Sequence, residues 1–257
     1  MPTPDFLIIG AQKCGTTSLF YYLSQHPDLS LPEIKELQFF TFEYSKGWPW
    51  YENQFPRQSI FEKKITGEAT PYYLFHPLVP KRVAQHLSKV KLIVMLRDPV
   101  ERAYSHYYHE IRHHAVNTEN ASYALLQEDH LISDEEKALI SGQIERSYSH
   151  QHHSFLSRGL YAKQIERWLQ YFPLSQMLFI KSEDFFNHPE IELVNVYQFL
   201  NIKKVLPKDL KAQNTNLYPG LTSEMRTKIS SFFDEDRKHL IRILGDKFSW
   251  PVHDLKI

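Results

Sequence analysis

A lysine inside a glycine-bounded loop is the residue of this chain with the most specific chemical potential. Residues 6–18 read FLIIGAQKCGTTS, so an apolar run enters a loop between Gly10 and Gly15, and two threonines follow. The backbone N–H groups of such a loop, with the start of the next helix, can wrap a phosphate. In a nucleotide triphosphatase the lysine directly follows the second glycine, whereas here Thr16 stands at that place and Lys13 lies three residues upstream. The spacing predicts a loop that holds a 5′-phosphate and places its cation differently from an enzyme that handles a β,γ-phosphate with magnesium.

Arg97 and Ser105 make a second candidate anion site. Arg97 follows an apolar run, and the next residues favour a helix, with Asp98 as N-cap, Pro99 at the first position and Glu101 completing a capping box. Ser105 lies two turns into that helix. Arginine and serine together can clamp a phosphate that is separate from the one in the loop.

The segment 157–161 is a weaker candidate of the same kind. Arg158 could contact phosphate and Tyr161 could line a pocket. A capped helix start explains the same residues equally well.

A carboxylate is needed if the site removes a proton from an acceptor. Glu36 follows the helix-breaking Pro32, and Glu68 ends an expected strand. Either could take a proton from an acceptor hydroxyl, and His106 and His109 on the predicted helix are further candidates. Strand-end position favours Glu68, and the residues alone leave the choice open.

Strands and helices alternate along the chain, which is typical of an α/β fold. Strands are expected over 6–9, 65–68, 91–96 and 177–180, and helices over 16–25, from 98 onward, and over 159–172, 191–200 and 222–244. Residues 28–60 are aromatic and irregular, whereas 115–155 are polar and rich in histidine, which predicts two short helices and a lid. We expect a single domain over 1–257, with a P-loop-like central parallel β-sheet flanked by helices on both faces. Ligands of such sheets bind at the carboxyl ends of the strands.

Composition limits the classes of partner. The chain has 257 residues, and its 30 lysines and arginines balance its 30 aspartates and glutamates, so no overall basic field favours nucleic acid. Its one cysteine, Cys14, excludes an intramolecular disulfide. No run of about 18 apolar residues and no basic-then-apolar leader is present in this sequence, so we expect a cytoplasmic protein without a membrane partner. A domain cut from a larger protein has the same appearance.

Four segments together resemble the sulfotransferases that use 3′-phosphoadenosine 5′-phosphosulfate (PAPS). They are residues 6–18, 36–40, 67–73 and 96–108, and the likeness runs from about residue 5 to 245. It is greatest to the heparan sulfate N- and O-sulfotransferases and their bacterial relatives. Segment 157–161, with Trp168 and the pair Phe172 and Pro173, resembles the family as well.

The resemblance implies a role for each matched residue. Lys13, Thr16 and Thr17 would hold the 5′-phosphosulfate, and Arg97 and Ser105 would hold the 3′-phosphate. Glu36 lands on the family's catalytic glutamate. The full cofactor set implied in this way is Gln12, Lys13, Cys14, Gly15, Thr16, Thr17, Ser18, Arg97, Ser105, Arg158 and Tyr218. Sulfuryl transfer would need no metal and would leave adenosine 3′,5′-bisphosphate (PAP) as product.

The sequence departs from the family pattern at three places. Gln38 replaces a frequent histidine, Ala69 replaces a lysine that contacts the acceptor in the polysaccharide enzymes, and the loop 213–221 lacks a Lys-Gly pair, where Tyr218 could stand in. The first two argue against a highly sulfated polysaccharide. The expected acceptor is the hydroxyl or amine of a sugar, a small natural product or a carrier-bound intermediate. The aromatic residues expected to line its site are Trp48, Trp50, Tyr51, Tyr72 and Tyr73.

Three other readings remain open from the sequence. Residues 109–113 match the zinc-protease motif H-E-x-x-H, which puts His109 and His113 on one helical face, and Glu128 could be a third ligand of a zinc metallohydrolase. A phosphate-loop kinase is disfavoured because Thr16 occupies the lysine position. A nucleotide-binding module without turnover is the third alternative.

Overall fold

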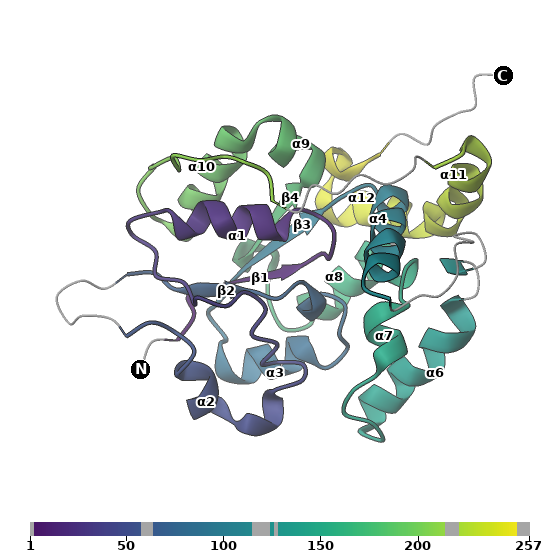
Figure 1. The fold of residues 1–257 in the computed structure, drawn as a ribbon, viewed down its shortest axis with the longest axis horizontal. Helices are drawn as coiled ribbons and strands as arrows, with labels where there is room; N and C mark the ends of the chain where they lie inside the picture. The colour runs from purple at the N-terminus through teal and green to yellow at the C-terminus, as the bar shows by residue number, and fades with distance from the viewer. Residues whose placement is uncertain (1–2, 58–63, 115–123, 126–127, 214–220, 251–257) are drawn as a thin grey trace. The chain divides into compact units, whose positions relative to one another are not determined.

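A computed structural model describes residues 3–57, 64–114, 124–125, 128–213 and 221–250 (Figure 1). The chain divides into two compact units. Unit 1 comprises Met1–Met95 and Trp168–Thr215, and unit 2 comprises Leu96–Arg167 and Asn216–Ile257.

Unit 1 is built on a four-stranded sheet in the order β2-β1-β3-β4. The strands are β1 Phe6–Gly10, β2 Gly67–Ala69, β3 Lys91–Leu96 and β4 Met177–Lys181. β1 pairs in parallel with β2 and with β3, so that Phe6 stands opposite both Gly67 and Lys91. Every residue of β1 is buried, which explains its unbroken apolar run. The parallel sheet predicted from the sequence is confirmed, although β2 begins two residues later than expected and Ile65 forms only an isolated bridge with Leu29.

Helices cover the sheet of unit 1 on both faces, as predicted: α1, α9 and α10 lie on one face and α3 lies on the other (Figure 1). The helices of this unit are α1 Thr16–Ser24, α2 Trp48–Glu52, α3 Val79–His86, α9 Ser182–Asn187 and α10 Pro189–Leu200. The short helices α2, α3 and α9 were not among the helices expected from the sequence. α3 has a proline in its first turn, a start signal that could have revealed it.

Unit 2 is helical. Its helices are α4 Pro99–Arg112, α6 Glu128–Ser141, α7 Tyr148–His152, α8 Tyr161–Leu169 (whose last two residues belong to unit 1), α11 Ser223–Ser230 and α12 Asp234–Leu244. The core of the unit lies against α4 and consists of Val100, Ala103, Tyr107, Leu125, Phe155, Leu156, Ile229 and Phe233. Two short helices were predicted within 115–155. The structure has two helices there, of which α7 is short and α6 has 14 residues. Residues 115–123 and 126–127 of that segment lie outside the described residues. The single helix expected over 222–244 is two helices joined by a 3₁₀ turn, Ser231–Phe233.

The helix α4 begins where the sequence predicted. The Asp98 carboxylate accepts from the N–H groups of Val100 (2.8 Å) and Glu101 (3.1 Å), which satisfies two otherwise unpaired donors. Arg102 and His106 are fully buried although both are polar, because α4 is enclosed within unit 2 on more than one side.

Candidate active site

The loop between β1 and α1 is shaped by its two glycines. A Cβ on Gly10 would lie 2.6 Å from Leu74 Cβ and 3.2 Å from the Pro71 carbonyl oxygen, so no side chain fits there. Gly15 is the N-cap of α1 with a φ of 93°, in the left-handed region, and its Cβ would lie 2.8 Å from Phe186 Cζ. The two glycines that suggested a phosphate loop are therefore both required by the backbone.

Hydrogen bonds fix this loop within unit 1. The Ala11 N–H donates to the Met95 carbonyl oxygen of β3 (2.7 Å), and Ser182 Oγ donates to the Cys14 carbonyl oxygen (2.7 Å). The Cys14 side chain is buried, and Ser18 Oγ is buried and accepts from the Gln213 N–H (2.9 Å). The Cys14 carbonyl oxygen and the Ser18 hydroxyl thus help to hold the loop in place, and direct contacts of Cys14 and Ser18 with a cofactor stay a prediction.

The start of α1 is suited to an anion. Within this fully described helix, no side chain caps the first N–H groups and no acidic residue stands in the first turn. The helix dipole and these N–H groups favour negative charge. Lys13 has a φ of 68° at the crown of the loop, and its side chain, with those of Gln12 and Thr17, is half-buried, whereas Thr16 is buried. The residues present therefore fit the phosphosulfate group that the resemblance implies.

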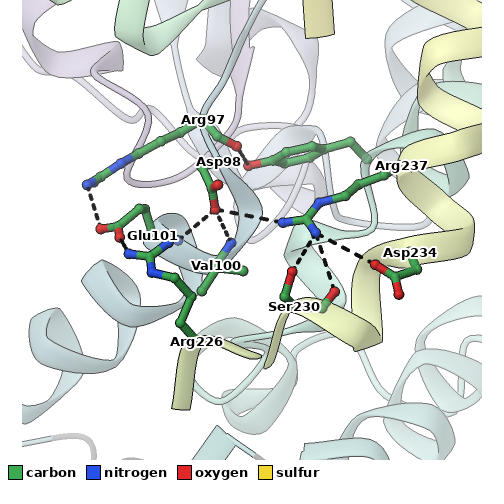
Figure 2. A network of polar contacts seen from close by, with 9 residues as sticks. Arg97, Asp98, Val100, Glu101, Arg226, Ser230, Asp234 and Arg237 are labelled. Carbon is green, nitrogen blue, oxygen red and sulfur yellow. Dashed lines mark hydrogen bonds and ion pairs between the residues drawn. The ribbon is translucent and has the colours of Figure 1, made fainter. Parts of the chain in front are cut away.

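In unit 2, Arg97 belongs to a cluster of charges at the start of α4 (Figure 2). Its Nη2 lies 3.4 Å from Glu101 Oε2, and the other oxygen of Glu101 accepts from Arg226 of α11. Glu101 therefore bridges two arginines rather than closing the predicted capping box. Ser105 lies further along α4 and is buried. Arg226 is a basic residue that sequence reasoning missed, because nothing in the sequence links α11 to the start of α4.

A second group of contacts ties the same turn to α12 (Figure 2). Arg237 donates to Ser230 Oγ (2.7 Å) and lies 3.8 Å from Asp234 and 4.0 Å from the Asp98 carboxylate. The Tyr161 hydroxyl donates to the Arg97 carbonyl oxygen (2.9 Å). These contacts hold the backbone that carries Arg97, so Tyr161, which was expected to line a pocket, is a buried support instead.

Arg158 is also a support rather than an exposed anion ligand. Its guanidinium is buried and donates to Ser154 Oγ (2.7 Å) and to the carbonyl oxygens of His150 (3.2 Å) and Gln151 (2.6 Å). These bonds engage the side chain within its own segment, which argues against the predicted contact with the cofactor. Tyr218 lies outside the described residues.

Glu36 lies at the carboxyl end of β2. Its N–H donates to the Ala69 carbonyl oxygen (3.0 Å), and Ala69 stands opposite Ile8 of β1. Its side chain is 44% exposed and is contacted by Lys35 Nζ (2.6 Å) and Gln38 Nε2 (3.4 Å). An exposed carboxylate at the same edge of the sheet as the glycine loop is accessible to an acceptor.

Glu68 is in the opposite situation. Its side chain is buried, Oε1 accepts from the hydroxyls of Tyr51 and Tyr73 (2.8 Å each), and Oε2 accepts from Thr70 Oγ1 (2.6 Å). Burial raises the pKa of this carboxyl, and the hydrogen bonds from Thr70, Tyr51 and Tyr73 oppose that rise. These partners argue against Glu68 as the base that strand-end position suggested.

Five aromatic residues were expected to line the acceptor site. Tyr51, Tyr72 and Tyr73 are buried, so that of this set only Trp48 and Trp50 are half-exposed.

The zinc-protease motif on α4 is used for other contacts. His109 and His113 are neighbours, with ring centroids 4.4 Å apart, but the Glu110 carboxylate is bound by His106 Nε2 (3.1 Å) and His152 Nδ1 (2.8 Å). Burial would raise the pKa of Glu110, and the hydrogen bonds from the two histidines hold it well below its usual range.

The proposed third ligand, Glu128, is buried and accepts from the N–H groups of Leu156 and Ser157. This carboxylate therefore does not contribute to a zinc site. Across the part of the chain that the structure describes, no group of three or more potential metal ligands comes together.

Comparison with known proteins places the chain in a family. Residues 3–239 match the model of the sulfotransferase domain. The chain is 26% identical to a membrane-associated sulfotransferase of Dictyostelium discoideum, over 96% of this chain and 66% of the relative, and 31% identical to the mouse bifunctional heparan sulfate N-deacetylase/N-sulfotransferase 4, over 94% and 30%. It thus spans less than two thirds of the length of these relatives. Among the described residues, no helix is both long enough and apolar enough to cross a membrane.

A solved structure agrees with this match. The sulfotransferase from Alicyclobacillus acidocaldarius is 27% identical, with a TM-score of 0.77 over 95% of this chain and 96% of that one. The glycine loop, the arginine after β3 and the glutamate at the end of β2 thus occur in a chain that belongs to the sulfotransferase family.

Proposed function

We propose that this protein transfers a sulfuryl group from PAPS to a hydroxyl or an amine. The observation that carries the proposal is the glycine loop with Lys13 at its crown and an uncapped helix start behind it. The 5′-phosphosulfate would be held by this loop, by its N–H groups and by Thr16 and Thr17. The 3′-phosphate would be held by Arg97 and Ser105, with Arg226 as an additional cation beside Arg97.

The chain's own residues divide the chemistry between them. PAPS supplies the sulfuryl group when it is bound. Lys13 provides positive charge where negative charge develops on the leaving oxygen, which lowers the barrier because the charge is already in place. Glu36 accepts the proton of the acceptor hydroxyl or amine on a carboxylate oxygen. No metal is required by this division of roles.

A saccharide, a small natural product or a carrier-bound molecule is the acceptor class that we propose. Relatives named as heparan sulfate sulfotransferases support a saccharide. Ala69 is fully buried and uncharged, and it stands where the resemblance would place a lysine. The end of β2 therefore carries less positive charge to attract a strongly anionic polymer. Nucleic acid and membrane are not proposed as partners.

The direct test is a transfer assay. Purified protein is incubated with PAPS and a panel of acceptors, for example an unsulfated polysaccharide, amino sugars and simple phenols, and PAP release is measured with and without each acceptor. Glu36→Gln should lower the turnover number by about 10²–10⁴-fold, the usual contribution of a general base. Glu33→Gln is the matched control, because Glu33 is an exposed glutamate three residues away on the same segment. Equal turnover in both variants would exclude Glu36 as the base, and no acceptor-dependent PAP release across a broad panel would contradict the proposed reaction.

A further inference from the structure

Glu68 is the centre of a buried polar cluster that the reaction as described does not use. Its two oxygens accept from Tyr51, Tyr73 and Thr70, and the Leu37 N–H is a fourth donor. An ionised carboxylate offers only acceptors, so it suits a site into which four donors point. Burial and the nearby charge of Glu68 raise the pKa of both tyrosines well above the usual value, so their hydroxyls remain donors.

The donors of this cluster reach the segment that carries Glu36. The Leu37 N–H donates to Glu68 itself, the Gln38 N–H lies 3.5 Å from Thr70 Oγ1, and the Phe40 N–H donates to the Tyr73 hydroxyl oxygen (3.3 Å). Three backbone N–H groups within four residues are thus held by Glu68 or by a side chain that is bonded to it.

The held segment has an unusual backbone. Glu36 has a φ of 67° and Gln38 has a φ of 55°, in the left-handed region that residues other than glycine seldom occupy. Such a conformation persists when the surroundings over-determine it. Here the surroundings are the bond from the Glu36 N–H to the Ala69 carbonyl oxygen, the contacts of the Glu68 cluster, and the stacking of the Phe39 ring on Tyr51, with centroids 4.4 Å apart.

We infer that Glu68 is a positioning residue, which holds the loop 36–40 in the strained backbone conformation that presents the Glu36 carboxylate at the end of β2. The inference rests on the proposed function, because it takes Glu36 as the base. Glu68 does not itself exchange a proton with the acceptor. Its effect on the reaction passes through the backbone from Leu37 to Phe40, and through Thr70 and Tyr73.

The first experiment measures the loop without any assay of activity. Amide hydrogen exchange is followed at residues 36–43 in the parent and in Glu68→Gln, where an amide N–H₂ replaces one acceptor oxygen and faces the same donors. Tyr73→Phe is a milder variant that removes one donor and keeps the carboxylate, for the case that Glu68→Gln does not fold. Asp5→Asn is the control. The Asp5 carboxylate accepts from the Thr66 N–H (2.9 Å) at the amino ends of β1 and β2, away from the loop 36–40. Faster exchange at 36–43 in Glu68→Gln and in Tyr73→Phe, and not in Asp5→Asn, is expected, whereas unchanged exchange in both would overturn the inference.

The second experiment asks whether the effect on rate passes through Glu36. Misplacement of a reacting group by about 1 Å can cost about 10²-fold, so Glu68→Gln should lower kcat by about that factor, with the Kd of PAP unchanged. In a Glu36→Gln background the same substitution should lower kcat little further, since the group that it positions is gone. An equal fall in both backgrounds, or a normal kcat despite faster exchange, would overturn the positioning role.

The two proposals can fail separately. A normal kcat in Glu36→Gln alone rejects Glu36 as the base, whatever Glu68 does. A large loss in Glu36→Gln together with a normal kcat in Glu68→Gln keeps the base and rejects the positioning residue.

Discussion

Replacement of Gly15 by alanine tests whether the loop backbone is the anion-binding element. Gly15 has a φ of 93°, and an L-residue in left-handed backbone costs about 1–2 kcal/mol. The new Cβ would also lie 2.8 Å from Phe186 Cζ and 3.3 Å from Met95 Cε. The Phe186 ring is 45% exposed and can move aside, so the backbone term should dominate the loss of stability.

Gly142→Ala is the matched control for this change. Gly142 has a φ of 75°, but nothing lies within 4 Å of its Cβ position, so alanine there incurs the backbone cost alone. Both variants should lose about 1–2 kcal/mol in the free energy of unfolding, which lowers the melting temperature by about 2–4 °C per kcal/mol in a protein of this size. Only Gly15→Ala should also weaken the binding of PAP, because Gly15 is the N-cap of α1 and relief of its left-handed strain shifts the N–H groups at the start of that helix.

The assay is thermal denaturation of the parent and of both variants, with and without a fixed concentration of PAP. A tenfold loss of affinity corresponds to about 1.4 kcal/mol less stabilisation by the ligand. If PAP stabilises Gly15→Ala as much as it stabilises Gly142→Ala and the parent, the loop is not the anion site.

Three further predictions concern individual charges. Lys13→Ala should lower kcat more than it weakens PAP binding, because the lysine charge matters most when the leaving oxygen becomes negative; parallel kinetics and titration check this, and an unchanged kcat refutes it. Arg97→Ala should weaken PAP binding by about 10–100-fold, as expected for loss of a hydrogen bond to a charged group, and should leave ADP binding nearly unchanged; calorimetric titration with both ligands separates the two. Burial raises the pKa of Glu128 to about 7 from 4.5, so the folded state binds more protons between these values and stability falls as pH rises from 4.5 to 7. At 1.36 kcal/mol per pH unit the parent should lose about 3 kcal/mol across this window relative to Glu128→Gln, and urea denaturation of both proteins at several pH values measures this difference.

Local signals made the strands and the start of α4 predictable from the sequence. The buried run of β3 and the capping role of Asp98 depend on near neighbours in the chain, and the structure confirms both. The same holds for the two glycines of the loop, whose spacing reflects a backbone that only glycine can adopt at Gly15.

The side-chain surroundings that the sequence did not reveal depend on how the chain folds back on itself, whether the partners are near or far in the sequence. From the sequence, Glu68 is expected to be an exposed carboxylate at a strand end, but it is buried and accepts from the hydroxyls of Tyr51 and Tyr73. Arg158 is expected to be a surface cation, but its guanidinium donates to backbone within 150–154. The bridge from Glu101 to Arg226 joins residues that are 125 positions apart. Periodicity and capping carry no information on such pairs, because tertiary packing alone decides them.

Calorimetric titration of the protein with PAP and with ADP tests the central claim most directly. The two nucleotides differ in that ADP lacks the 3′-phosphate, the group assigned to Arg97 and Ser105. PAP should bind more tightly than ADP without magnesium, and at about 100 times its Kd it should stabilise the fold by about 2.7 kcal/mol. Equal affinity for the two nucleotides, or tighter binding of ADP that requires magnesium, would contradict the assignment of this chain to PAPS-dependent sulfuryl transfer.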